Sequence, residues 1–264
     1  MTVPGFPATR KPVIGMIHLP PLPGSPASRL SLEEIRDWVL GDAEALATGG
    51  VNGFIVENYG DAPFYPRRVP PHTVAFMTVL AREVKAKFGL PLGVNVLRND
   101  ALAALAVATA AGAEFIRVNV YTGARLADQG ILEGEAHEVL RSRKLLGSEV
   151  RIFADVAVKH SAPLAARPLR DEVEDTILRG RADAIIVSGA ATGKETCLDD
   201  LREAKAAARS TPVLVGSGVH AGSAAEVLRL ADGLIVGTAF KIDGVTTNAV
   251  DRSRVREFMA QVSS

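Results

Sequence analysis

Pro212-Val213-Leu214-Val215-Gly216-Ser217-Gly218-Val219 is the stretch that decides the fold. It predicts a short buried strand that runs directly into a glycine turn. Gly233-Leu234-Ile235-Val236-Gly237-Thr238-Ala239-Phe240-Lys241 repeats this pattern further along the chain. Two adjacent parallel strands that end in small residues place backbone N–H groups side by side, and such a nest binds an anion, usually a phosphate.

In eight-stranded α/β barrels a phosphate site lies after strands seven and eight. The two stretches therefore predict a phosphate site if six more strands precede them. Its expected residues are Gly216, Ser217, Gly218, Gly237 and Thr238.

The length and composition fit one large α/β unit. The chain has 264 residues, and a single barrel needs about 250; two smaller domains are the alternative. The 30 basic and 30 acidic side chains balance, so no basic surface predicts a nucleic-acid partner. We expect a single domain over residues 1–264, with residues 1–11 as an N-terminal extension.

Cysteine use and hydropathy indicate the compartment. The single cysteine, Cys197, excludes a disulfide framework and fits a reducing environment. No apolar run reaches the roughly 18 residues that cross a bilayer. The proline-rich residues 1–11 lack the apolar core of a signal peptide. We expect a cytoplasmic homo-oligomer without an integral membrane segment, and peripheral association with a membrane stays open.

The rest of the chain predicts six further strands, each followed by a helix. The strands are expected at residues 13–18, 53–58, 91–96, 114–120, 151–160 and 183–189. Ser31-Leu32-Glu33-Glu34 is a capping box that begins one helix, and Asn99-Asp100 caps another. Residues 122–131 are expected to form a loop.

Nearly continuous apolar strands of this kind are typical of parallel strands that are buried on both faces. A doubly wound open sheet is the competing architecture. Eight strand–helix units without a visible linker, together with the paired glycine turns, favour a closed (β/α)8 TIM barrel.

Polar residues gather at the C-terminal ends of the predicted strands, which is the catalytic face of barrel enzymes. The strand starts carry mainly Glu114, Arg151 and Asp183, which we interpret as solvated charges. The residues at the C-terminal ends are His18, Glu57, Asn58, Asn95, Asn119, Asp155, Lys159, His160 and Ser188.

Several of these residues also have a purely structural interpretation. His18 precedes a proline-rich loop and could hydrogen-bond only its own turn. Asn95 and Asn119 could hold loop backbones, because asparagine readily bonds nearby main chain. Glu57 could form a salt bridge with Arg117 or Lys159.

Asp155 and Lys159 are the strongest catalytic candidates. Residues four apart on a strand share a face, so both side chains point the same way if the strand continues that far. A carboxylate and an amine at a barrel mouth suit acid–base catalysis, metal binding or imine formation; the alternative is an ion pair that closes the barrel. His160 would point to the other face.

Two glycine-rich stretches fail as nucleotide motifs. Gly189–Thr196 resembles a P-loop, but only three residues separate its glycines and Glu195 follows Lys194. Gly216-Ser217-Gly218 lacks the third glycine of a dinucleotide fingerprint. The five histidines show no metal-binding spacing, so we expect no metal and no cofactor.

With these residues in place, the chain resembles the BtpA/SgcQ family from residue 11 to the end. The matching segments are Gly15–Gly24, Val56–Phe64, Pro91–Asp100, Phe115–Asn119, Asp155–His160, Gly216–Gly218 and Val236–Thr238. The resemblance implies a TIM barrel of the ribulose-phosphate-binding type. One branch of the family is associated with photosystem I biogenesis, and another is encoded among sugar-phosphotransferase genes. No substrate is settled for the family.

The leading hypothesis is an enzyme that acts on a small phosphorylated metabolite, by isomerase, epimerase or aldolase/lyase chemistry. Non-catalytic assembly factors and ligand sensors are the alternatives. The catalytic residues would be Asp155, Lys159 and Glu57. The substrate would be bound by His18, Asn58, Asn95, Arg117, Asn119, His160 and Ser188.

Overall fold

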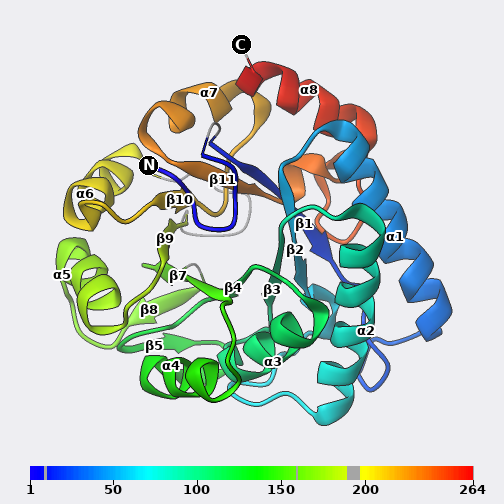
Figure 1. Cartoon of the computed structure of the whole chain (residues 1–264), viewed down its shortest axis with the longest axis horizontal. Coiled ribbons are helices and arrows are strands. Elements are labelled where there is room, and N and C mark those ends of the chain that lie inside the picture. Colours follow the sequence, from blue (N-terminus) through cyan, green and yellow to red (C-terminus); the bar gives the residue numbers. More distant parts are fainter. Residues whose placement is uncertain (9–10, 159, 189–196, 264) are drawn as a thin grey trace.

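The computed structural model describes residues 1–8, 11–158, 160–188 and 197–263, and its centre is a closed barrel of parallel strands (Figure 1). The strand order is β1-β11-β10-β9-β7-β4-β3-β2, and β1 pairs with both β2 and β11. The TIM barrel is thereby confirmed, and the open sheet is wrong. The strands are β1 (Val13–His18), β2 (Gly53–Glu57), β3 (Leu92–Asn95), β4 (Phe115–Val118), β7 (Arg151–Val156), β9 (Ala184–Val187), β10 (Val213–Val215) and β11 (Gly233–Val236).

Helices α1 to α8 form a ring around the strands in Figure 1. The predicted capping box begins α1: Ser31 Oγ accepts from the Glu34 N–H, and a Glu34 carboxylate oxygen accepts from the Ser31 N–H. Asp100 caps α3, also as predicted. The helices are α1 (Leu32–Gly49), α2 (Pro71–Phe88), α3 (Ala101–Ala111), α4 (Ala136–Leu145), α5 (Leu169–Glu174), α6 (Leu198–Ala208), α7 (Ala221–Leu230) and α8 (Arg252–Ser263).

The N-terminal end of the barrel is filled with apolar side chains. Phe115 and Phe153 stack inside it with ring centroids 4.4 Å apart. Phe6, from the N-terminal segment, reaches Phe115 at 5.9 Å, and Val3 joins the same buried cluster. Residues 1–8 therefore close this end, so any ligand must enter from the opposite one.

Carboxylates at the strand starts accept an N–H from the first two residues of a neighbouring strand. Glu114 accepts from Leu92 at 2.8 Å, and Asp183 accepts from Ile152 at 2.8 Å. Asp232 does the same for Val213 at 2.8 Å. Our interpretation of Glu114 and Asp183 as solvated charges is therefore wrong, because an N–H at the edge of the barrel needs an acceptor.

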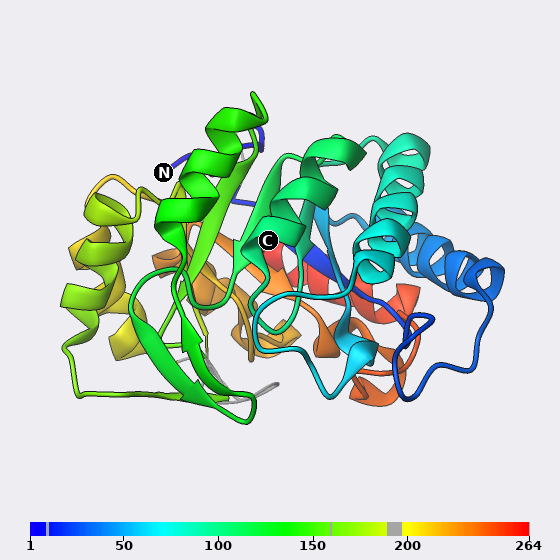
Figure 2. The same cartoon turned by 90° about the horizontal axis from the view of Figure 1, so that it is seen from below.

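Two segments differ from the sequence-based expectation. The strand predicted at 151–160 ends at Val156, because Ala157 takes a left-handed conformation with φ 48°. Residues 122–131 are not a loop: β5 (Ala124–Ala127) and β6 (Gly130–Glu133) form a hairpin. With β8 (Ser161–Pro163) they make an antiparallel sheet at the end of the barrel away from the N-terminus (Figure 2). Lys159 and Gly189–Thr196 lie outside the described residues.

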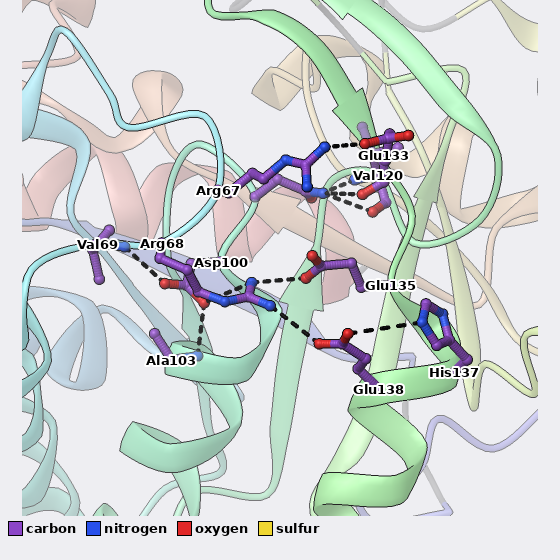
Figure 3. A network of polar contacts seen from close by, with 11 residues as sticks. Arg67, Arg68, Val69, Asp100, Ala103, Val120, Glu133, Glu135, His137 and Glu138 are labelled. Atoms are coloured by element: carbon purple, nitrogen blue, oxygen red, sulfur yellow. Dashed lines mark hydrogen bonds and ion pairs between the residues drawn. The ribbon is translucent and has the colours of Figure 1, made fainter.

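A polar network joins this hairpin to the loop between β2 and α2 (Figure 3). Arg67 pairs with Glu133 of β6, and Arg68 reaches Glu135 at 2.7 Å and Glu138 at 3.2 Å. Asp100 also accepts from the Val69 N–H at 2.8 Å. The loop after β2 is thus attached to the segment after β4, across the intervening strand β3.

A buried ion pair holds the loop that follows β11. Lys241 Nζ lies 2.7 Å from Asp42 Oδ2, in the middle of α1, and neither side chain is more than 2% exposed. Asp42 Oδ1 accepts from the Val250 N–H at 2.7 Å. Burial lowers the pKa of Lys241, against the attraction of Asp42.

We expect Asp42→Asn to lower the free energy of unfolding by about 3–5 kcal/mol, because it leaves the Lys241 ammonium buried without a counter-charge. Equilibrium urea unfolding measures this. The matched control is Asp199→Asn, which breaks the exposed pair with Arg202 and should cost no more than about 1 kcal/mol. Equal effects of the two variants would contradict the prediction.

Candidate active site

Strand alternation builds a polar layer at the C-terminal end of the barrel. Inward positions recur every second residue, so Met16 is followed by His18, Ile55 by Glu57 and Phe153 by Asp155. The same step is made on every strand of the barrel. We call the resulting set the mouth layer: His18, Glu57, Asn95, Arg117, Asp155, Ser188, Gly216 and Gly237.

Arg117 and Asp155 form a two-pronged ion pair in this layer. Arg117 Nε and Nη2 each donate to one Asp155 oxygen at 2.9 Å, and the two side chains are 3% and 0% exposed. Asn119 Nδ2 and Ser188 Oγ also donate to Asp155, each at 3.0 Å. With four donors on its two oxygens, Asp155 is better suited to orient Arg117 than to transfer a proton.

The Arg117 guanidinium stays charged in this pair, and the absence of a side chain at Gly216 leaves space beside it. Burial opposes the charge, but the Asp155 carboxylate and the nearby Glu57 raise the pKa of Arg117 above its ordinary value. A Cβ atom at Gly216 would lie 3.2 Å from Arg117 Nη2 and 2.4 Å from Ile186 Cγ2. A side chain at 216 would therefore clash mainly with Ile186 and would also crowd Arg117.

Asn95 and Asn58 both form hydrogen bonds within the protein, as the structural alternative for Asn95 expects. Asn95 Nδ2 donates to the Arg117 carbonyl at 3.1 Å and to Asn119 at 3.2 Å. Asn58 Oδ1 accepts from the Leu97 N–H at 2.7 Å, and Asn58 lines a cavity beside the mouth.

A cavity of about 190 Å³ lies between the turns after β10 and β11. Thr238 and Ala239 begin the short turn η3 (Thr238–Phe240), and the first N–H groups of such a turn have no acceptor within it. All five predicted phosphate-binding residues line this cavity: Gly216, Ser217, Gly218, Gly237 and Thr238.

Glu57 and His18 face this cavity from β2 and β1. His18 Nε2 lies 3.7 Å from Glu57 Oε1, and the His18 ring contacts Tyr59 with a centroid distance of 4.8 Å. A Cβ atom at Gly237 would lie 2.8 Å from His18 Cε1. The site thus combines a carboxylate and an imidazole next to the glycine turns.

A larger cavity of about 780 Å³ continues from the first. His18, Glu57, Tyr59 and Arg117 line both, so the two form one connected site. Asn119 and His160 line only the larger one, and His160 is exposed at its rim.

A family model and the sequences of known relatives assign this chain to the same family. The model of the BtpA family matches residues 9–264. The chain belongs to the BtpA family. It is 47% identical over 251 residues to the photosystem I biogenesis protein BtpA of Synechocystis sp., covering 95% of this chain and 88% of the relative. An uncharacterised mitochondrial protein of Caenorhabditis elegans is 34% identical, with 97% and 95% covered.

Solved structures share the fold at low sequence identity. The α-subunit of tryptophan synthase from Pyrococcus furiosus gives a TM-score of 0.59 at 16% identity, covering 96% of this chain and 97% of that one. Phosphoribosylanthranilate isomerase of the same organism gives 0.57 at 16% identity, with 95% and 98% covered. At this identity the likeness shows a TIM barrel and nothing about chemistry.

The structure adds lining residues to which the sequence analysis gave no role in the site. Arg98, only 5% exposed, and Asp128, at the tip of the β5–β6 hairpin, line the larger cavity. Burial lowers the pKa of Arg98, against the attraction of Asp155, Glu57 and Asp128. Arg98 follows a strand by three residues, but its loop has no periodicity that could place it. Tyr59, Trp38 and Phe64 also line this cavity.

Within the ranges that the structure describes, no group of three or more His, Cys, Asp or Glu side chains is arranged to hold a metal ion. In the same ranges no helix has the length and apolar character needed to cross a membrane.

We expect Gly216→Ala to lower the free energy of unfolding by about 1–3 kcal/mol, because the added methyl group overpacks the mouth layer against Ile186 and Arg117. Urea unfolding again measures it. Gly41→Ala is the matched control: Gly41 lies inside α1 with open space around it, so alanine there should add about 0.5–1 kcal/mol. A neutral or stabilising Gly216→Ala would contradict the crowding.

Proposed function

We propose that the protein binds a small phosphorylated metabolite and transfers a proton on it, as an isomerase or epimerase does. One observation carries the proposal: the glycine turns after β10 and β11 open into the same cavity as Glu57, His18 and Arg117. Amide groups that converge in such turns favour a phosphate dianion. A metabolite anchored there presents its carbon skeleton to the carboxylate and the imidazole.

The three side chains suit complementary roles. Glu57 would remove a proton from carbon, and His18, 3.7 Å away, would exchange a proton with the adjacent oxygen. Arg117, already oriented by Asp155, would stabilise the negative charge that develops on that oxygen. Such a preorganised charge is the largest contribution in many enzymes.

The proposed phosphate site can be tested by introducing a negative charge into the turn after β11. We expect Thr238→Asp to abolish the rise in melting temperature that ribose 5-phosphate causes, because a carboxylate in the turn repels the phosphate. In the unmodified protein a ligand at 100 times its Kd adds about 2.7 kcal/mol of stability. Ser210→Asp, an exposed change before β10 at the other end of the barrel, is the control of equal charge and should keep the shift.

The proton-transfer part can be tested without knowing the natural substrate. Aldose and ketose phosphates incubated with the protein in D2O should take up deuterium at carbon, followed by NMR. We expect Glu57→Gln to lower this rate by about 10²- to 10⁴-fold, the usual contribution of a general base, and to leave the thermal shift in place. An unchanged rate would contradict the role of Glu57.

If the protein were instead a lyase that forms an imine, borohydride trapping would reveal it. Borohydride would then trap a covalent adduct at Lys159, detected by mass spectrometry of the digested protein. Because β7 ends before Lys159, strand alternation no longer supports pairing this amine with Asp155. Finding no adduct would favour proton transfer, and an adduct at Lys159 would favour the lyase.

A second candidate is an assembly factor that uses the barrel without turnover. The relative named as a biogenesis protein favours it, and so does an exposed apolar pair on the hairpin: Leu126 and Ile131 face each other across β5 and β6 and are 51% and 52% exposed. In that case Leu126→Lys would remove the function and Glu57→Gln would not. The enzyme proposal expects the reverse in the deuterium assay.

A further inference from the structure

The larger cavity limits what a bound metabolite can be. Its 780 Å³ falls within the range of about 300–1,000 Å³ that encloses a drug-sized ligand, whereas the cavity at the glycine turns has about 190 Å³. His18, Glu57, Tyr59 and Arg117 form the boundary that the two share. A molecule held by its phosphate in the small cavity can therefore extend past Glu57 into the large one.

Much of the lining of the larger cavity is apolar. Trp38 comes from α1, Tyr59 from the turn after β2, and Phe64 from the loop beyond it. Leu19, Pro20 and Leu30 add to this apolar lining. Sugar hydroxyls against such a surface would lose their hydrogen bonds to water without replacement, which is unfavourable. An aromatic ring would instead gain stacking contacts.

The same cavity also has polar lining residues. Arg98 is 5% exposed and close enough to Asp128 for the carboxylate to influence its pKa. Asn119 lines the same cavity. A cavity lined by aromatic rings together with a guanidinium and a carboxylate suits a heteroaromatic ring with polar substituents.

We propose that the phosphorylated ligand carries a planar aromatic or heteroaromatic ring, which lies in the larger cavity against Trp38, Tyr59 and Phe64. The ligand class is thus a pentose phosphate that bears a ring and binds more tightly than a free sugar phosphate; nucleoside 5′-monophosphates, which have no carbonyl for the proton transfer, serve as binding probes for it. This inference rests on the proposed function, because it takes the phosphate position from the glycine turns.

Trp38 makes the test direct, because it is the single tryptophan of the chain. Its fluorescence should be quenched by AMP, UMP or nicotinamide mononucleotide, but not by ribose 5-phosphate or inorganic phosphate. We expect at least one of the three ring-bearing ligands to bind about tenfold or more tightly than ribose 5-phosphate, since stacking one base on aromatic side chains contributes about 1–3 kcal/mol. Calorimetry measures the affinities independently of the fluorescence.

Substitutions then locate the ring. Phe64→Ala and Trp38→Ala should each weaken binding of that ligand about tenfold and leave ribose 5-phosphate unchanged. Tyr65→Ala is the matched control, because Tyr65 is an exposed aromatic residue of the same loop that lines a neighbouring cavity only. Urea unfolding of each variant separates lost contacts from lost folding, and Phe64→Ala keeps the Trp38 signal.

The outcomes separate the two proposals. If ribose 5-phosphate binds and none of the ring-bearing ligands binds more tightly, the inference about the ring is overturned and the proposed phosphate site stands. If Phe64→Ala and Trp38→Ala have no more effect than Tyr65→Ala, the ring does not lie in this cavity and the inference is also overturned. If neither ribose 5-phosphate nor any ring-bearing phosphate binds, the proposed function itself fails.

Discussion

The closed barrel imposes one constraint from which the site follows: every second residue of each strand must point into a narrow interior. At the N-terminal end this space is filled by stacked aromatic rings and by Phe6. At the C-terminal end the next inward positions are polar on six strands and glycine on two. The glycines leave a hollow on one side of the mouth, because β10 and β11 are neighbours, and the charged groups face it from the other strands.

Charges in such a place are costly to bury, and the Arg117–Asp155 pair shows how the cost is met. Two hydrogen bonds join the partners, and Asn119 and Ser188 satisfy the remaining positions of the carboxylate. A buried pair of this kind adds little net stability compared with apolar residues of the same volume. Its presence in the mouth layer is better explained by a functional role: it fixes a positive charge beside Glu57 and the glycine turns.

The sequence predicts those features that depend on residues close together in the chain, and it does not predict those that depend on tertiary contacts. The barrel, the capping box at Ser31 and the grouping of Glu57, His18 and the glycine turns follow from patterns of two to four residues. The end of β7 does not, because alanine at 157 has no intrinsic preference for φ 48°; its N–H is held by Glu172 Oε1 at 3.0 Å. The hairpin was missed because each strand has four residues with weak alternation. Arg98 and Trp38 reach the cavity only through tertiary packing.

The loops at the rim of the barrel are held by different interactions from those that fill its interior. There, loops are fixed by single carboxylates that accept main-chain N–H groups from another segment, as Asp42 does for Val250, Asp100 for Val69 and Asp61 for Leu22. Each of these bonds fixes a backbone without specifying the side chains that the loop carries. The loops with Phe64 and Pro20 can therefore change these side chains without disturbing the mouth layer. Chemistry would then depend on the strands, and the choice of ligand on the loops.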